Sequence, residues 1–530
     1  ETVTWYFGVR AIDDAGNVSE VGSVSTSEIR YNYAVVSPDN LIAESVINGA
    51  FAVYASVIPQ GLGDLDGDGK AELKVGGVLL DTSCIIYGRE TSGIDSAMAV
   101  SSLDANTQCF TGEPGGNLGE PAVNLGDVNG DTINDLGLGY GNDSFNNDDF
   151  GNPGPAKELR VYLGQSDNNN RPGTTHDLAF RGMKFSSFGL GTTVGSGDFT
   201  GDGINDIIVG SEYSLENRIY VVPGRSVWPE PANGDYYDFD NADDQSSLRL
   251  VTIELKDSTP LTKAGKFVYV MGDVLKDTDG KPRADIAFSI QDLPPQVILI
   301  KGRDITAATT LNLTQTLDCT VSGEAVADCD DANTLRLAPD DVDTKGFGTY
   351  MNGGVDIDGD DHPDVVIAHN GNSPGRSQYF FDGAALDAAP LGTTVSLNTS
   401  SAESFDPFYY LGTGGVVLAG EVLDVDFLMR NVGSGPAVEA LVTRKFNKGT
   451  ISGDAFELRL NVDDGDGGLG YGKFPYSSVE FRDPRDPSDS GYNGANFSDW
   501  GAVVFGDFNG DSYDDFIFPQ ASASGSIFVY

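Results

Sequence analysis

Asp64-Leu65-Asp66-Gly67-Asp68-Gly69-Lys70-Ala71-Glu72 is a short acidic loop whose pattern recurs along the whole chain. Oxygen-bearing side chains stand at the first, third, fifth and ninth positions. A hard cation such as Ca²⁺ prefers six to eight oxygen ligands, and this spacing can wrap them around one point, with the seventh residue offering its carbonyl. One such loop can occur by chance in an Asp-rich protein, but five in one register do not. The pattern therefore predicts a repeat first and a metal site second.

The five loops supply the candidate metal ligands, with the seventh residue of each included for its carbonyl. In chain order they are Asp64, Asp66, Asp68, Lys70 and Glu72; Asp127, Asn129, Asp131, Ile133 and Asp135; Asp198, Thr200, Asp202, Ile204 and Asp206; Asp356, Asp358, Asp360, His362 and Asp364; and Asp507, Asn509, Asp511, Tyr513 and Asp515. Asn129 and Thr200 carry no charge, so we expect their sites to bind an ion more weakly than the first loop does.

Two further units carry altered loops. Around Gly272 the loop is expanded, which leaves its metal geometry open; its candidate ligands are Asp273, Asp277, Asp279 and Asp285. Around Gly420 the loop has collapsed to 421–426, which is too short to encircle an ion, so we expect that unit to be structural and free of metal. Five intact loops, one expanded loop and one collapsed loop make seven units.

The composition limits the classes of partner. The formal net charge is −48 over 530 residues, which argues against nucleic acid and anionic membrane surfaces, because both need a basic protein surface. Two interpretations of the acidity stay open: a solvated, mutually repelling surface suited to a salty exterior, and divalent-cation binding, which explains only the carboxylates in the loops. No stretch approaches the roughly 18–20 apolar residues of a membrane span.

The four cysteines form two pairs that are close in sequence, Cys84 with Cys109 and Cys319 with Cys329. Neither pair has the spacing of a zinc knuckle or of a CxxC redox motif. We interpret them as two small-loop disulfides, which predicts an oxidising, extracellular or cell-surface location. The alternative is four buried free thiols.

The acidic loops belong to a longer repeat of about 60 to 90 residues. Each unit opens with an apolar strand that runs into Gly-Asp, as at 123–127 and 194–198, and the loop and further short strands follow. We expect an all-β fold: a seven-bladed β-propeller of four-stranded antiparallel blades with calcium-binding loops. The last unit stops at its third strand, near Tyr530. We expect the surplus strand at 30–36 to supply the missing outer strand and so close the ring.

The units resemble FG-GAP repeats, which form the blades of the integrin alpha-subunit head and of many bacterial secreted proteins. The Phe-Gly pair stands at 188–189 and 347–348, and softened versions stand at 118–119, 411–412 and 500–501. The likeness covers residues 30–530. It implies calcium at the intact loops, and the ligand pattern points to calcium independently.

Residues 1–29 differ from the rest. Trp5, Phe7, Val9 and Ala11 alternate on one face, and the segment resembles the last strands of a fibronectin type III domain. The resemblance implies a place inside a larger modular extracellular protein.

A search for catalytic patterns finds no GxSxG elbow, no phosphate-binding glycine loop and no HExxH. The three histidines are scattered, so a zinc site is not expected. We therefore expect no enzyme but an adhesion, binding or scaffolding module, with a protein or glycan at the cell surface, or copies of itself, as partner. The alternatives are a structural subunit of an extracellular filament or sheath and, third, a polysaccharide lyase, a class that includes calcium-bearing propellers.

Overall fold

The structure is a computed structural model of the 530-residue chain. It describes residues 34–36, 45–48, 60–77, 82–89, 98–99, 106–112, 118–140, 158–182, 190–211, 218–256, 267–277, 279–290, 295–338, 347–355, 362–369, 378–396, 420–430, 437–448, 451–460, 477–482, 504–508, 510, 515–520 and 526–529. The segment 1–29, for which a fibronectin type III likeness is expected, lies outside them.

The described residues are mostly β, in several mixed and antiparallel sheets. Seven of these sheets have three or more strands, and we number them in the chain order of one strand from each: 60–61, 118–126, 190–197, 268–270, 347–355, 420–430 and 504–506.

Sheets 1 to 4 contain most of the residues whose side chains are described. Sheet 1 is β3 (Gln60–Gly61), β4 (Leu73–Gly77), β5 (Thr82–Ile86) and β7 (Thr107–Thr111); sheet 2 is β8 (Leu118–Gly126), β9 (Asp135–Tyr140), β10 (Glu158–Tyr162), β11 (Leu178–Arg181) and β15 (Tyr237–Asp238); sheet 3 is β12 (Leu190–Gly197), β13 (Asp206–Ser211), β14 (Arg218–Val222), β16 (Val251–Leu255) and β20 (Thr309–Leu313); sheet 4 is β17 (Val268–Val270), β18 (Ile286–Ile290), β19 (Gln296–Ile300), β23 (Thr334–Ala338) and β27 (Thr393–Ser396).

The remaining sheets complete the chain. Sheet 5 is β24 (Phe347–Val355), β25 (Asp364–His369) and β26 (Gln378–Phe381); sheet 6 is β28 (Gly420–Arg430), β29 (Ala437–Lys448), β30 (Ile451–Leu460), β31 (Ser477–Arg482) and β1 (Ala34–Val36); sheet 7 is β32 (Val504–Gly506), β33 (Asp515–Gln520), β34 (Ser526–Val529), β2 (Ser45–Asn48) and β6 (Met98–Ala99); a small hairpin joins β21 (Thr320–Val321) to β22 (Glu324–Ala325). The described helices are short: η4 (Ser166–Asn168), α1 (Ala242–Leu248), η5 (Asp331–Asn333) and α2 (Gly383–Ala388).

Several second and third strands, such as β13, β14, β18 and β19, form because they are short runs rich in β-branched residues. In β18 and β19 every residue is buried. Such strands are covered on both faces, so they read as continuous apolar runs rather than as alternating patterns. The cores lie between neighbouring sheets; one cluster joins β13 and β14 to β18 and β19.

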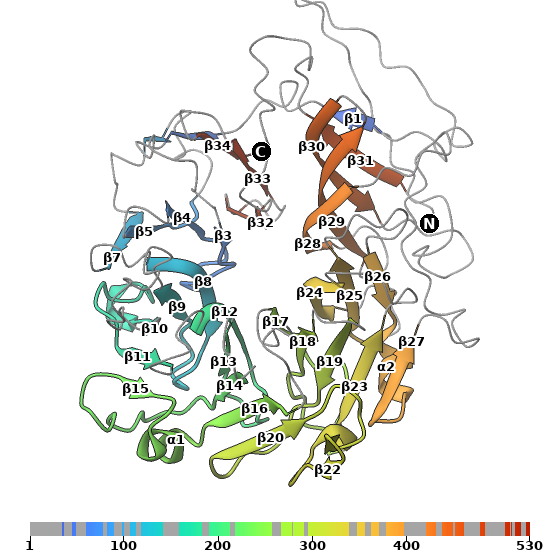
Figure 1. Cartoon of the computed structure of the whole chain (residues 1–530). Coiled ribbons are helices and arrows are strands. Elements are labelled where there is room, and N and C mark those ends of the chain that lie inside the picture. The colour runs from blue at the N-terminus through green and yellow to red at the C-terminus, as the bar shows by residue number, and fades with distance from the viewer. Residues whose placement is uncertain are drawn as a thin grey trace, which may run out of the picture.

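Sheets 1 to 6 pack against one another in chain order, as Figure 1 shows. Contacts join sheets 1 and 2, 2 and 3, 3 and 4, 4 and 5, and 5 and 6, and β32 of sheet 7 contacts β3 of sheet 1. The last sheet therefore lies beside the first, which brings the two ends of the repeat array together.

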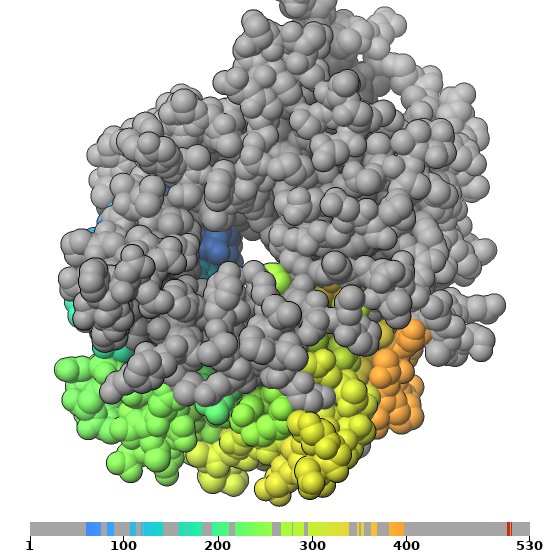
Figure 2. All heavy atoms as spheres, in the orientation of Figure 1, coloured from blue at the N-terminus to red at the C-terminus, as the bar shows by residue number. Residues whose placement is uncertain are grey.

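An outer fifth strand connects one sheet to the next. β15 lies in sequence between β14 and β16 of sheet 3 but pairs in parallel with β11 of sheet 2. In the same way β20 leaves sheet 4 for β16, β27 follows sheet 5 and pairs with β23, and β6 leaves sheet 1 for β2. The described residues from 218 to 396, green to orange in Figure 2, form the lower rim in that view. The four outer strands β6, β15, β20 and β27 cover strand edges that would otherwise expose unpaired backbone groups.

The strand that completes the last sheet is not the expected one. β2 (Ser45–Asn48) pairs antiparallel with β34, whereas β1, inside 30–36, pairs in parallel with β31 of sheet 6. The prediction for 30–36 is therefore wrong. The length of the connection gives the reason. The fourth strand of a sheet leads by a short connection into the first strand of the next sheet, as with the 12 residues between β16 and β17. Only 11 residues separate β2 from β3 in the same way, whereas 23 separate β1 from β3.

The segment expected as a collapsed loop, 421–426, is part of a continuous strand. β28 runs from Gly420 to Arg430 and pairs with β29 along its length, with one register shift between Val422 and Asp424. Residues 421–430 contain no glycine, proline or asparagine to turn the chain and are rich in β-formers.

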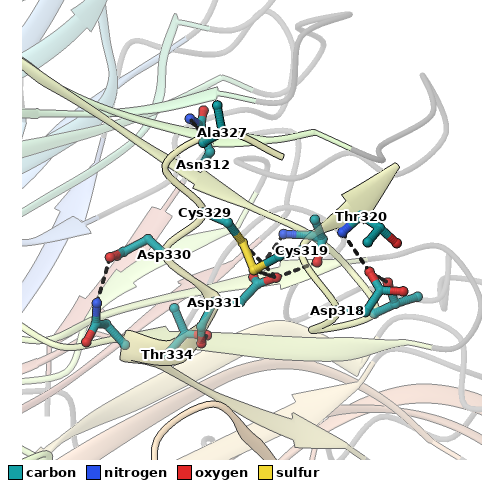
Figure 3. The surroundings of a disulfide bond; sticks show 12 residues. Asn312, Asp318, Cys319, Thr320, Ala327, Cys329, Asp330, Asp331 and Thr334 are labelled. Carbon is teal, nitrogen blue, oxygen red and sulfur yellow. Dashed lines mark hydrogen bonds between the residues drawn. A yellow bond between two sulfur atoms is a disulfide. The ribbon is translucent and has the colours of Figure 1, made fainter. Parts of the chain in front are cut away.

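Both expected disulfides are present, and all four cysteines are used. Cys84–Cys109 links the paired strands β5 and β7. Cys319–Cys329 closes the loop that carries β21 and β22, and Figure 3 shows Asp331 lying against it. The buried Asp331 carboxylate accepts a hydrogen bond from Thr314 N (2.9 Å) and forms an ion pair with the buried Arg336 (2.8 Å). No described helix is long and apolar enough to cross a membrane.

Candidate metal-binding loops

Each acidic loop connects the first and second strands of its sheet. The loops at 64–72, 127–135 and 198–206 join β3 to β4, β8 to β9 and β12 to β13. The expanded loop at 273–285 joins β17 to β18. The repeat therefore places equivalent acidic turns at the same end of successive sheets.

The first aspartate of a loop holds the turn through its carboxylate. In the third loop, Asp198 accepts hydrogen bonds from the backbone N–H groups of Gly201 (2.6 Å), Asp202 (3.1 Å) and Gly203 (2.8 Å). Asp64 and Asp127 make the corresponding bonds in the first two loops. An aspartate that caps the following N–H groups is a recurrent way to fix a tight turn.

The sixth position of these turns has a left-handed backbone. Gly203 has φ of +86°, and Gly69 in the first loop has φ of +87°. The second loop places Thr132 there, with φ of +73°. A residue with a β-branched side chain is strained in this region, whereas glycine is not.

The third position carries oxygens that lack partners. Asp66 Oδ1 and Thr200 Oγ1 are buried, and neither has a hydrogen-bond partner among the described residues. The other carboxylate oxygen of Asp66 forms an ion pair with Arg171 Nε (2.9 Å), whose guanidinium also stacks over the Tyr87 ring. In the second loop, Asn129 bonds Asp131 instead.

The ninth carboxylate braces the loop against the end of the third strand. Asp206 is fully buried and accepts from Thr200 N and Gly224 N, both at 2.8 Å. Gly224 follows β14, and a Cβ there would lie 2.2 Å from the Asn205 carbonyl oxygen, so no larger residue fits. The same paired arrangement recurs at three other positions: Glu72 with Leu65 and Gly88, Asp135 with Val128 and Gly164, and Asp285 with Leu275 and Gly302. Asp364 likewise accepts from Gly383 N, after β26.

Burial of the ninth-position carboxyl groups opposes their ionisation. Desolvation raises the pKa of Asp135 and of Asp206 to about 7, and that of Glu72 to about 8, although backbone N–H groups pull each pKa down. A nearby cation would favour the charged form of all three groups.

The first loop fits a cation best among the described loops. One carboxylate oxygen from each of Asp64, Asp66 and Glu72 lies within 4.8 Å of the other two. Converging carboxylate oxygens, together with the orphaned Asp66 Oδ1, match the all-oxygen ligand set that Ca²⁺ prefers. A second group, Cys319, Cys329 and Asp331, is not a comparable site, because both sulfurs are bound in a disulfide and no thiolate is left to ligate a metal.

Two intact loops are described only in part. His362 and Asp364 of the fourth loop are described, whereas Asp356, Asp358 and Asp360 lie outside the described residues. In the last loop, Asp507 accepts from Gly510 N (2.6 Å), and Asp515 begins β33. Asn509, Asp511 and Tyr513 lie outside the described residues.

The loops also join one sheet to the next. The backbone N–H at the eighth position donates to the first-position carbonyl of the preceding loop: Asn205 to Asp127 (2.9 Å), Ala284 to Asp198 (2.7 Å) and, across the ends of the array, Ala71 to Asp507 (2.8 Å). Between the first and second loops, the Asn134 side chain donates to the Asp64 carbonyl (2.9 Å). These turns are therefore also joints between neighbouring sheets.

A second backbone hydrogen bond, which the acidic-loop pattern does not predict, strengthens three of these joints. Arg89, Arg225 and Arg303 donate their backbone N–H to Phe508, Val128 and Phe199 of the preceding loop, at 2.8 to 3.0 Å. The available signal was a Gly-Arg pair after the third strand, at 88–89, 224–225 and 302–303.

Comparisons with known proteins add limited support. Residues 190–222 match the FG-GAP repeat family. The matched segment contains β12, the third acidic loop, β13 and β14. No curated protein matches the chain.

Similarity to solved structures is weak. The chain is similar to Sqt1 of Chaetomium thermophilum at 10% identity and a TM-score of 0.37, over 87% of this chain and 78% of that one. It is similar to rhamnogalacturonan lyase YesW at 12% identity and a TM-score of 0.35, over 98% and 79%, and to exotype rhamnogalacturonan lyase YesX at 10% and 0.29, over 94% and 90%.

Proposed function

We propose that this chain is a calcium-stabilised, seven-bladed β-propeller of FG-GAP repeats that acts outside the cell as a binding or scaffolding module. The two disulfides and the FG-GAP match support an extracellular location. The contact between the last sheet and the first supports a closed ring, latched by β2 rather than by residues 30–36.

The acidic turns carry this proposal. Their carboxylates cap backbone N–H groups, brace the third strand and join neighbouring sheets, while Asp66 and Thr200 each keep a buried oxygen without a partner among the described residues. These contacts support an architectural role, in which Ca²⁺ would neutralise carboxylates that the turn itself brings together. Asp64, Asp66, Asp68 and Glu72, with the Lys70 carbonyl, would hold the ion in the first loop.

We infer a non-catalytic role, because the carboxylates of the described acidic turns, such as Asp198 and Asp206, already accept hydrogen bonds from backbone N–H groups. Binding would then use surface loops outside these turns, with a protein, a glycan or further copies of the chain as ligand. The fold alone does not select among these ligands. The filament subunit, the polysaccharide lyase and the fibronectin-like segment at 1–29 stay predictions.

Thermal unfolding with and without calcium tests the proposal. A site that binds only the folded chain contributes about 2.7 kcal/mol when free calcium is about one hundred times Kd. Several such sites should lower the melting temperature of the full chain clearly in excess chelator. Added magnesium should restore less stability than calcium does, since it favours a smaller octahedral site. An unchanged melting curve in chelator would remove structural calcium from the account.

A further inference from the structure

The expanded loop places an arginine at the position whose backbone carbonyl is the candidate ligand in the intact loops. Arg283 stands two residues before the buried Asp285, as Lys70 stands before Glu72 and Ile204 before Asp206. It therefore occupies the seventh position of the repeat. Its side chain is 5% exposed, although the expanded loop is a surface turn.

The guanidinium of Arg283 gathers the carboxylates of this region. It pairs in a bidentate manner with Asp279, at 3.0 and 2.9 Å, and with Asp277 Oδ2 at 3.0 Å. It also reaches Asp304, beyond the end of β19, at 3.0 Å. A planar guanidinium with several donors suits such multiple pairing, which a single ammonium cannot match.

A second cation lies beside the same carboxylates. Lys301 Nζ is 3.4 Å from Asp277 Oδ1. Asp277, the central carboxylate of the expanded loop, is thus flanked by two positive side chains. A divalent ion at Asp277 would meet both charges at short range in a partly buried place. The first loop differs, because its two cations, Arg171 and Lys70, pair with different carboxylates.

The expanded loop has also lost features of the intact turns. Asp273, at the first position, keeps one buried oxygen without a hydrogen-bond partner among the described residues, whereas Asp198 caps three N–H groups. Asp277 Oδ2 also lacks a hydrogen-bond partner there, but it lies 3.0 Å from Arg283 Nη1, so the guanidinium meets its charge. What the loop retains is the Asp285 brace to Leu275 and Gly302.

Arg283 also belongs to the joint with the preceding sheet. A Cβ on Gly201, in the third acidic loop, would lie 2.7 Å from Arg283 Nε. Lys70 covers Gly510 of the last loop in the same way, and Ile204 covers Gly130 of the second. The seventh side chain therefore lies over the preceding loop in all three cases, and Arg283 in addition pairs with carboxylates of two segments.

We propose that Arg283 is the built-in cation of the expanded loop, so that this loop holds its turn without calcium. The inference rests on the proposed function, in which the intact loops bind calcium. It removes Asp273, Asp277, Asp279 and Asp285 from the set of calcium ligands.

Calcium bound per chain, measured by competition with a chromophoric chelator on the full-length protein, tests this directly. Asp279→Ala should bind the same number of ions as wild type, because its carboxylate pairs with Arg283. Asp202→Ala, which removes an exposed oxygen from the intact third loop, should bind one ion fewer. Loss of one ion in Asp279→Ala would overturn the proposal for the expanded loop alone.

Urea unfolding in excess chelator supplies a test that does not need calcium. Arg283→Gln should unfold at a lower urea concentration than wild type, because three carboxylates lose their shared partner. Lys70→Gln is the matched control at the same loop position. Lys70 forms an ion pair with the exposed Asp68 in its own loop, so the midpoint of this variant should move much less. Equal shifts would overturn the proposal. If wild type binds no calcium, the proposed function fails, and this comparison still decides the role of Arg283.

Discussion

Asp206→Ala separates the bracing role of a loop carboxylate from its role as a metal ligand. Asp206 is fully buried and accepts hydrogen bonds from Thr200 N and Gly224 N, both at 2.8 Å. Alanine would leave both N–H groups without an acceptor, at a cost of about 1–3 kcal/mol each. Because burial raises the pKa of Asp206 to about 7, the desolvated charge offsets part of that loss. We expect a net destabilisation of about 2–4 kcal/mol.

The assay is urea unfolding of the full chain, followed by fluorescence, in saturating calcium and again in excess chelator. A lower midpoint with an unchanged m-value reports a loss of stability. Asp206→Ala should be destabilised under both conditions, since its two acceptor bonds do not involve the ion.

The matched control is Asp202→Ala at the fifth position of the same loop. Asp202 is exposed and accepts only from Ile204 N, at 3.1 Å, in its own turn. Its loss should cost under about 1 kcal/mol in chelator and more in calcium, where a ligand is removed. If the effect of Asp206→Ala vanished in chelator, the ninth carboxylate would act only through the metal, and the bracing argument would be refuted.

Two further changes test local features. Thr132→Gly should raise the free energy of unfolding by about 1 kcal/mol, because Thr132 has φ of +73° where the first and third loops have glycine; a loss of stability in the same urea assay would show that the threonine side chain outweighs its strain. Replacing Cys319 and Cys329 together by serine should destabilise the protein by about 2–3 kcal/mol, since the bond closes a loop across a sequence separation of 10; an unchanged midpoint would mean that Asp331, Thr314 and Arg336 fix this loop without the bond.

Short-range patterns in the sequence predicted the strands and the turns well. The runs that became β13, β18 and β25 follow directly from β-branched residues between turn-forming ones. The position of the acidic loops between first and second strands followed from the repeat, and the local pairing of cysteines predicted both disulfides.

Contacts between segments that are distant in the sequence could not be predicted from the sequence pattern. The brace between Asp206 and Gly224 spans 18 residues, and Arg283 reaches Asp304 over 21. Neither pair has a fixed spacing that a single sequence reveals. The latch was misassigned for a similar reason: both 30–36 and 45–48 contain β-formers, and only the sheet shows which of them pairs with β34.

The number of calcium ions that bind the full-length chain tests the central claim most directly. Equilibrium dialysis followed by metal analysis should give one ion for each intact acidic loop and none for the expanded loop. A chain that binds no calcium, yet keeps its melting temperature in chelator, would contradict the account.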